Sequence, residues 1–274
     1  MRNKHFFTDK VVIITGASSG IGEALARQMA ALQAKVVLAA RSTEKIVAIA
    51  EELGSNALAI TVDVSKENDC QRLIEESITH FGRIDILVNN AGISMRAAFE
   101  DVDLQVLHRL MDVNFWGCVY CSKYALPHLL KSKGSLVGVS SIAGYVGLPC
   151  RTGYSASKFA MNGFLETLRA EYQYQGLHVM TFAPNFTASN VRFSALTADG
   201  SPQGATPRKE EKMMSAEDCA KCLIKGLRHR RKQMVLTLLG KLTVYFFRVF
   251  LPGITRKTEY KMMFNEPDSP LRKF

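Results

Sequence analysis

Short apolar runs alternate with longer amphipathic stretches along most of the chain. The runs are rich in β-branched residues and predict strands at 10–15, 35–40, 57–62, 84–89, 135–140, 177–182 and 233–238. The stretches between them predict helices at 21–33, 43–53, 67–82, 103–131, 153–175 and 216–228. Continuous apolar strands separated by helices are typical of parallel strands that are buried on both faces. We therefore predict an α/β fold, a single doubly wound domain with a seven-stranded, mostly parallel sheet and helices on both faces.

A long polar stretch, residues 185–215, interrupts the alternation after the sixth predicted strand. Connections of this length in compact domains are usually functional. Doubly wound sheets bind ligands beyond the carboxyl ends of their strands. We therefore predict that 185–215 forms a lid over a site, the alternative being a disordered surface loop.

The C-terminal region is apolar beyond the last predicted strand. Residues 234–251 include Gly240, Lys241 and Arg248, and the run is shorter than the about 20 uninterrupted apolar residues that a membrane-spanning helix needs. We assign 1–240 to the domain and 241–274 to an apolar and basic extension. Residues 242–253 of this extension fit two interpretations: packing over a binding cleft or against another subunit, and a peripheral contact with a membrane interface.

Length and composition narrow the possibilities further. A chain of 274 residues suits one α/β domain with a full core, two small domains being the alternative. The net charge of +10 favours an anionic partner, such as a phosphorylated cofactor, an acidic protein or a membrane surface. We find no nucleic-acid-binding motif. The first ten residues lack the apolar segment of a secretory signal, so we expect a cytoplasmic location, with peripheral membrane contact as an option.

Six cysteines are present, and two pairs have the CxxC spacing: Cys118 with Cys121, and Cys219 with Cys222. Both pairs fall in predicted helices, and no histidine stands beside them at ligand spacing. We therefore expect reduced, buried thiols and no metal site.

A glycine-rich turn, "TGASSGIG" (15–22), connects the first predicted strand to the first helix. Glycines allow a tight turn and a close approach of backbone to a pyrophosphate. The helix that begins near Gly20 directs its free N–H groups at that phosphate. The turn therefore predicts dinucleotide binding in a Rossmann-like fold.

The end of the second predicted strand reads "AARS", with Arg41 and Ser42 where an NAD-binding sheet usually carries an acidic residue. A guanidinium suits the additional 2′-phosphate of NADP. We therefore predict NADP(H) rather than NAD, the alternative being a surface arginine at a helix start. Asp63, after the third strand, is a candidate acceptor for the adenine amino group or a cap for the helix that begins near Ser65.

Tyr154, Lys158 and Ser141 indicate proton-transfer chemistry. Lys158 follows Tyr154 by four residues, so both lie on one face of a predicted helix. A phenol titrates near pH ~10, and a nearby ammonium stabilises its anion. Lowering that pKa to ~7 takes about 4 kcal/mol, much of which one poorly solvated cation can supply. Taken singly, the three could also be a core tyrosine, a surface lysine and a helix cap.

Five motifs occur in order over about residues 8–184: "TGASSGIG", "NNAG" (89–92), Asn114 in "DVNFWG", "SSIAG" (140–144) and "YSASK" (154–158). Together they resemble the short-chain dehydrogenase/reductase family. The resemblance implies that Tyr154 is the general acid in ketone reduction and the general base in alcohol oxidation. It also implies that Ser141 binds the substrate oxygen, that Lys158 binds the nicotinamide ribose, and that Asn114 anchors a water that relays protons from Lys158.

The catalytic set is therefore Asn114, Ser141, Tyr154 and Lys158. The cofactor-binding set is Gly16, Ser18, Ser19, Gly20, Ile21, Arg41, Ser42, Asp63, Val64, Asn90, Ala91, Gly92, Tyr154, Lys158, Pro184 and Thr187. Asn89, Ala91 and Gly92 are expected to pack against the cofactor by their backbone.

The chain departs from the family pattern after the sixth strand. Pro-Gly followed by a threonine is common there, whereas this chain reads "APNFTAS", with Asn185 after Pro184. Asparagine tolerates the left-handed backbone that glycine adopts, so the turn can persist. Thr187 then fits the residue that binds the nicotinamide carboxamide.

The apolar C-terminal region favours an apolar substrate, such as a steroid, a sphingoid base or a long-chain ketone. We therefore predict an NADP(H)-dependent oxidoreductase that interconverts a ketone and a secondary alcohol. Two alternatives stay open: a 3-oxoacyl-(acyl carrier protein) reductase, whose acidic partner would suit the positive charge, and a non-catalytic NADP-binding scaffold or sensor. The helices at 103–131 and 153–175 match the pair that joins subunits in this family, which implies a homodimer or homotetramer.

Overall fold

The computed structural model describes residues 5–184, 187, 191–206 and 213–273. It contains a parallel seven-stranded sheet in the order β3-β2-β1-β4-β5-β6-β7. The strands are β1 (Val11–Thr15), β2 (Lys35–Ala40), β3 (Ala57–Thr61), β4 (Ile86–Asn89), β5 (Ser135–Val139), β6 (His178–Ala183) and β7 (Gln233–Val235). The predicted α/β class and doubly wound seven-stranded sheet are confirmed.

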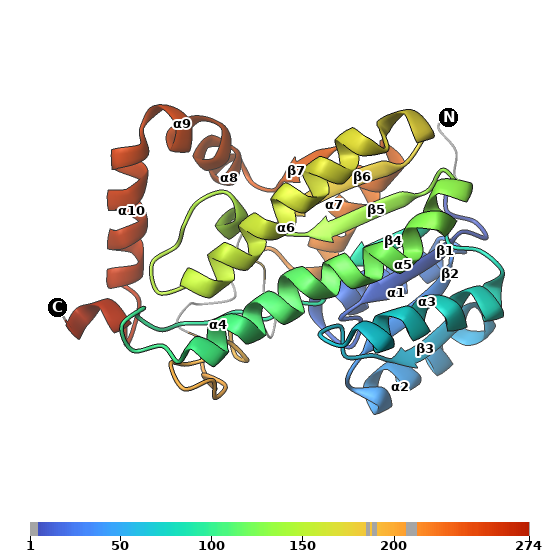
Figure 1. Cartoon of the computed structure of the whole chain (residues 1–274), viewed down its shortest axis with the longest axis horizontal. Coiled ribbons are helices and arrows are strands. Elements are labelled where there is room, and N and C mark those ends of the chain that lie inside the picture. The colour runs from blue at the N-terminus through green and yellow to red at the C-terminus, as the bar shows by residue number, and fades with distance from the viewer. Residues whose placement is uncertain (1–4, 185–186, 188–190, 207–212, 274) are drawn as a thin grey trace.

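Helices cover both faces of the sheet. They are α1 (Gly20–Ala31), α2 (Thr43–Leu53), α3 (Glu67–Phe81), α4 (Leu104–Met111), α5 (Gly117–Lys131), α6 (Thr152–Glu171) and α7 (Ala216–Arg228). One apolar core lies between the sheet and α1, α2 and α7, and a second lies under α3, α5 and α6. Figure 1 shows α3, α5 and α6 crossing the near face.

The strands are apolar throughout because successive side chains enter different cores. Val12 and Ile14 of β1 belong to the first core, whereas Val11 and Ile13 belong to the second, and all four are fully buried. The strand order reverses between β1 and β4, so the loops at their carboxyl ends diverge there and open a crevice.

Two predicted elements differ in detail. The predicted helix 103–131 is interrupted by a π-helical segment, Asp112–Trp116, which joins α4 to α5. The predicted strand 233–238 ends at Val235 instead. Thr237 adopts φ +65° and its Oγ1 accepts a hydrogen bond from the Gly240 N–H at 3.1 Å, so it caps a helix where the strand was expected to continue.

The C-terminal extension folds as helices against the carboxyl edge of the sheet. α8 (Leu238–Leu242), a π-helical segment (Thr243–Phe247) and α9 (Arg248–Phe250) form one run, and α10 (Pro252–Phe264) follows (Figure 1). The Arg96 Nε lies 3.4 Å from the Glu266 Oε2, and both side chains are buried, so this ion pair fixes the tail to the loop after β4. None of the helices in the described ranges is both long and apolar enough to cross a membrane.

The cysteines are free thiols, as expected. Five are buried and Cys222 is half-buried. Burial raises the pKa of Cys118 and of Cys219 to about 12 each, although hydrogen bonds with Ser122 and Thr187 oppose the shift. Such thiols stay protonated near neutral pH and behave as small apolar side chains.

Candidate active site

The glycine turn after β1 packs directly against the turn after β4. Gly16 adopts φ +66°, and a Cβ there would lie 2.9 Å from the Ala91 Cα, so this position requires glycine. The Asn90 Nδ2 donates to the carbonyl oxygens of Thr15, at 2.9 Å, and of Gly16, at 3.2 Å. Asn90 therefore joins the two turns, a structural role that the motif alone did not indicate.

A groove runs over these turns at the carboxyl ends of β1 to β4. Twelve of the predicted cofactor-binding residues line it: Gly16, Ser18, Ser19, Gly20, Ile21, Arg41, Ser42, Asp63, Val64, Asn90, Ala91 and Gly92. Ser19 and Ser42 make no side-chain hydrogen bond to the helix that each precedes, so their hydroxyls can serve a ligand. The groove, with the α1 N-terminus beside it, fits a dinucleotide pyrophosphate.

Asp63 combines the two predicted roles. It lines the groove, and its Oδ1 also accepts hydrogen bonds from the Ser65 N–H, at 3.0 Å, and hydroxyl, at 2.8 Å. Asn89 is different, because its buried side chain donates to the Ser122 Oγ at 3.1 Å and it does not line the groove. The structure therefore does not bring Asn89 to the position predicted for it.

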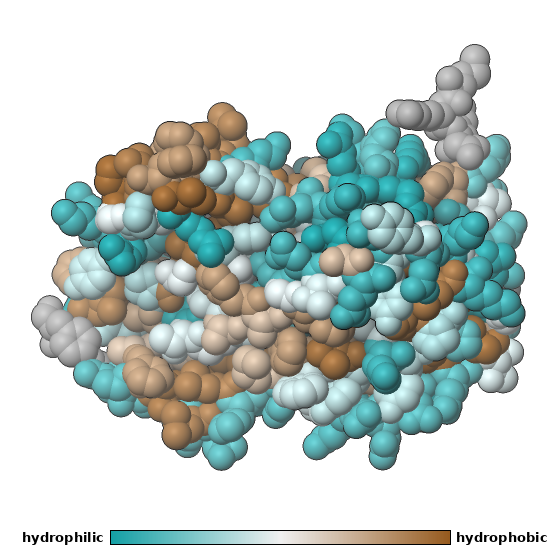
Figure 2. Space-filling model, turned by 45° about the horizontal axis from the view of Figure 1, so that its top comes forward, coloured by the Kyte–Doolittle hydropathy of each residue, from teal (hydrophilic) through white to brown (hydrophobic). Residues whose placement is uncertain are grey.

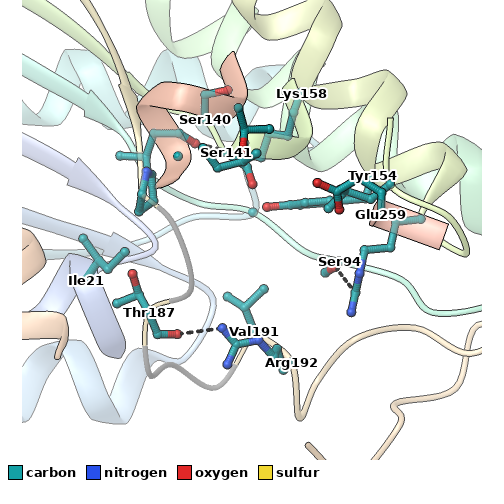
Figure 3. A pocket seen from close by; sticks show the side chains of 18 of the residues that line it. Ile21, Ser94, Ser140, Ser141, Tyr154, Lys158, Thr187, Val191, Arg192 and Glu259 are labelled. Atoms are coloured by element: carbon teal, nitrogen blue, oxygen red, sulfur yellow. Dashed lines mark hydrogen bonds between the residues drawn. The ribbon is translucent and has the colours of Figure 1, made fainter. Parts of the chain in front are cut away.

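A second cavity adjoins the groove, and both share Ile21, Asn90, Gly92 and Val191. Ser141, from the turn after β5, and Tyr154 and Lys158, from α6, line this catalytic cavity. Figure 3 shows the hydroxyls of Ser141 and Tyr154 directed toward one another on one side of it. The cofactor groove thus leads directly to the predicted proton-transfer residues.

Lys158 is held beside Tyr154 by burial and by one hydrogen bond. Its side chain is 3% exposed, and Nζ donates to the Val139 carbonyl oxygen at 2.9 Å. Nζ lies 6.0 Å from the centre of the Tyr154 ring. Ser141 caps a short 3-10 turn, and its Oγ accepts a hydrogen bond from the Ala143 N–H at 3.2 Å. The Lys158 amine therefore points into the site and not into bulk solvent.

The predicted lowering of the Tyr154 pKa by Lys158 is wrong for this structure. Burial raises the pKa of Tyr154, and a hydrogen bond with Ser141 and the charges of Arg151 and Arg192 offset only part of the shift. Burial also lowers the pKa of Lys158 to about 8. Both groups occupy one poorly solvated region, where burial disfavours the charged form of each.

Asn114 lies on the π-helical segment and is 1% exposed. Its Oδ1 accepts from the Ile93 N–H at 2.8 Å, and its Nδ2 donates to the Ile93 carbonyl oxygen at 3.0 Å and to the Ser157 Oγ at 2.9 Å. A Cβ on Gly92 would lie 3.0 Å from the Asn114 Oδ1 and 3.4 Å from the Lys158 Nζ. Asn114 thus ties the turn after β4 to α6 close to Lys158, and its proton relay stays a prediction.

Pro184 and Thr187 line the catalytic cavity at the end of β6. Thr187 is buried, and its carbonyl oxygen accepts a hydrogen bond from the Arg192 Nη2 at 3.1 Å (Figure 3). Asn185 and Phe186, where the sequence departs from the family pattern, lie outside the described residues.

Part of the segment predicted as a lid is joined to the loop after β4. The Leu196 N–H donates to the Ser94 carbonyl oxygen at 2.9 Å, and the Leu196 carbonyl oxygen accepts from the Arg96 N–H at 2.8 Å. Val191 lines both the groove and the catalytic cavity. Of residues 191–206, Val191, Arg192 and Ser194 line the groove or the cavity, and the role of 185–215 as a lid stays a prediction.

Several residues of the catalytic cavity were not predicted from the sequence. They are Ser94, Arg151, Arg192, Leu239, Thr243, Glu259 and Met262. The Arg151 Nη1 donates to the Ser94 Oγ at 3.3 Å and to the Met95 carbonyl oxygen at 2.9 Å. Arg151 stands just before the "YSASK" helix, so its position offered a signal, whereas nothing local marks Glu259 on α10.

The comparisons with known proteins agree with this geometry. The family model for short chain dehydrogenase matches residues 10–199. The chain is 32% identical over 264 residues to zebrafish (Danio rerio) dehydrogenase/reductase SDR family member 7B, which covers 93% of this chain and 85% of that protein. It is 37% identical over 256 residues to Arabidopsis thaliana 11-beta-hydroxysteroid dehydrogenase 1A. That match covers 89% of this chain and 73% of that protein.

Solved structures show the same fold. An alcohol dehydrogenase from the archaeon Thermococcus sibiricus, complexed with 5-hydroxy-NADP, matches with a TM-score of 0.72 and 26% identity over 83% of this chain and 95% of that one. A Burkholderia phymatum short-chain dehydrogenase/reductase in complex with NAD matches with a TM-score of 0.77 over 96% and 98%, and its 23% identity supports the fold alone. The chain belongs to the short-chain dehydrogenase/reductase family of oxidoreductases.

Proposed function

We propose that the protein is an NADP(H)-dependent oxidoreductase that interconverts a ketone and a secondary alcohol on a steroid- or lipid-like substrate. The observation that carries the proposal is the single cavity in which Tyr154, Ser141 and buried Lys158 meet the end of the cofactor groove. The names of the steroid dehydrogenase relatives support the substrate class.

In this mechanism Tyr154 moves a proton between its phenolic oxygen and the substrate oxygen. Ser141 hydrogen-bonds the same substrate oxygen and stabilises the charge that develops on it. Lys158 keeps a cation beside the phenol, since a pKa of about 8 leaves the amine mostly charged at neutral pH. The nicotinamide ring, when bound, supplies or accepts the hydride.

The chain's own residues also explain how the cofactor would be held. The α1 N-terminus and the glycine turn suit the pyrophosphate, and Arg41 and Ser42 suit a 2′-phosphate at the far end of the groove. Thr187 suits the carboxamide end, because it lines the cavity on the catalytic side. A preference for NADP over NAD follows from Arg41 standing where NAD-binding sheets place an acid.

The cavity walls favour a substrate with an apolar body and a second polar group. Ile142, Leu148 and Leu239 contribute apolar surface. Arg151 and Arg192 contribute guanidinium groups to the same cavity as the Tyr154 phenol. A steroid or long-chain ketone with a distal hydroxyl or carbonyl combines both properties.

An NADPH absorbance assay with steroid and long-chain ketones tests the proposal. We expect NADPH consumption with at least one of these substrates, and tight NADPH binding measured by fluorescence. Binding without turnover on any of them, or on a 3-oxoacyl thioester, would instead indicate a scaffold. Turnover confined to the thioester would indicate acyl reduction.

We also propose a cytoplasmic homodimer or homotetramer that uses α5 and α6. A large side chain is exposed near each helix: Trp116, just before α5, is 43% exposed, and Phe159, on α6, is 37% exposed. Gel filtration at low micromolar concentration should show an oligomer, and a monomer alone would reject this assembly.

A further inference from the structure

The C-terminal helices expose a continuous set of large apolar side chains. We call this set the C-terminal apolar surface: Leu238, Leu242, Tyr245, Phe246, Val249, Phe250 and Ile254. Their exposed fractions range from 40% to 75%. Figure 2 shows an apolar patch at the upper left, where Figure 1 places α8 and α9. Apolar patches of this kind usually mark an interaction site.

These apolar side chains are exposed because the helical run from α8 to α9 contacts the sheet along one edge. Val244 is buried against Ala183 and Val235. Gly240 allows a close approach, because a Cβ there would lie 3.1 Å from the Ile142 Cδ1. One edge of the run therefore holds it to the sheet, and most of its circumference faces outward.

The helices α8 and α10 also carry exposed basic residues. Lys241, Arg256, Lys257 and Lys261 are exposed, and no described acidic side chain forms an ion pair with any of them. The single acidic residue within 238–264 is Glu259, which lines the catalytic cavity instead. The surface therefore combines exposed apolar side chains with uncompensated positive charge.

We propose that the C-terminal apolar surface binds the interface of a bilayer that contains anionic lipids. An exposed apolar helix face inserts among lipid chains at shallow depth, and basic side chains beside it contact anionic headgroups. A second copy of the chain fits less well, since a self-complementary contact would bring the same positive charges together.

The position of this surface links it to the catalytic cavity. Leu239, Gly240 and Thr243 line that cavity from the same helical run that exposes Leu242 and Phe246. On the proposed function, an apolar substrate dissolved in the bilayer would reach Tyr154 without passing through bulk water. Membrane binding itself does not depend on that function.

Co-sedimentation with vesicles tests the proposal on the full chain. Vesicles of phosphatidylcholine alone are compared with vesicles that contain phosphatidylglycerol. We expect binding to the anionic vesicles that weakens at high salt. Phe250→Ser should weaken it at least about tenfold. Phe99→Ser is the matched control, because Phe99 is 63% exposed and Phe250 is 65% exposed, and it should bind like the wild type.

A double substitution of basic residues tests the electrostatic contribution to membrane binding. Arg256→Gln with Lys257→Gln should weaken binding to anionic vesicles roughly 25-fold, whereas Lys225→Gln with Lys232→Gln should change it little. Failure of the wild type to sediment with anionic vesicles would overturn the proposal. So would equal loss in Phe250→Ser and Phe99→Ser, or a smaller oligomer in Phe250→Ser by sedimentation velocity, which would identify a subunit contact. Turnover of a water-soluble ketone by Phe250→Ser reports separately on the proposed function.

Discussion

The cofactor groove and the catalytic cavity are adjacent, but they are built in different ways. The groove is lined mainly by loops at the ends of β1 to β4, and most of its residues belong to short contiguous motifs. The catalytic cavity takes residues from Ile21 to Met262, including side chains from α8 and α10. The lining of the groove is therefore encoded locally, whereas the lining of the catalytic cavity depends on how the C-terminal extension folds back.

The largest expected effect falls where the two regions meet. Tyr154→Phe should lower turnover by about 1000-fold, because the phenyl ring cannot transfer a proton. The NADPH dissociation constant should stay within about twofold, measured by fluorescence titration. Tyr145→Phe is the control, since Tyr145 bonds Gln233 at 2.6 Å and does not line the cavity. Equal losses in both variants would show that Tyr154 has a structural role only.

The attachment of the C-terminal tail can be broken at its buried ion pair. Glu266→Gln should reduce the free energy of unfolding by about 3 kcal/mol, because it leaves Arg96 buried without its carboxylate. Glu52→Gln removes the exposed pair with Arg27, at 2.6 Å, and should cost less than about 1 kcal/mol. Denaturant unfolding measures both. Similar losses of unfolding free energy in the two variants would mean that the ion pair of Arg96 and Glu266 does not fix the tail.

A substitution in the cofactor groove should change the cofactor preference without altering the catalytic cavity. Arg41→Asp should shift the ratio of kcat/KM for NADPH over NADH toward NADH by about 30-fold, because a carboxylate replaces the cation expected to meet the 2′-phosphate. Lys45→Asp makes the same change of charge on α2, but Lys45 does not line the groove. An unchanged ratio in Arg41→Asp would contradict the NADP assignment.

The smallest expected effect tests the substrate region alone. Met262→Ala should raise KM for an apolar ketone by about fivefold, because it removes apolar surface from the cavity wall. NADPH affinity should not change. Ile254→Ala, on the same helix but 58% exposed, should leave KM as it is. A change in cofactor affinity in Met262→Ala would show that the two regions are not separable.

Most of the fold was predictable because its signals are local and periodic. Strands such as β1 are continuously apolar, since their alternate side chains enter two different cores. The end of β7 was not predictable, because Leu236–Leu238 is apolar enough for a strand and the cap at Thr237 depends on its backbone conformation. The π-helical segment around Asn114 was also missed, because no local pattern in the sequence marks the wider i→i+5 turn.

The individual strands and helices, the glycine turn and the spacing of Tyr154 and Lys158 were readable from the sequence, because each depends on residues within a few positions of one another. Only the tertiary structure decided that Glu259 and Met262 reach the catalytic cavity, and that Asn90 joins two turns. It also decided that burial raises the Tyr154 pKa, because the cost of removing charge from water depends on every atom packed around the group. Contacts between distant segments and the solvation of a site are properties of packing, and no local pattern specifies them.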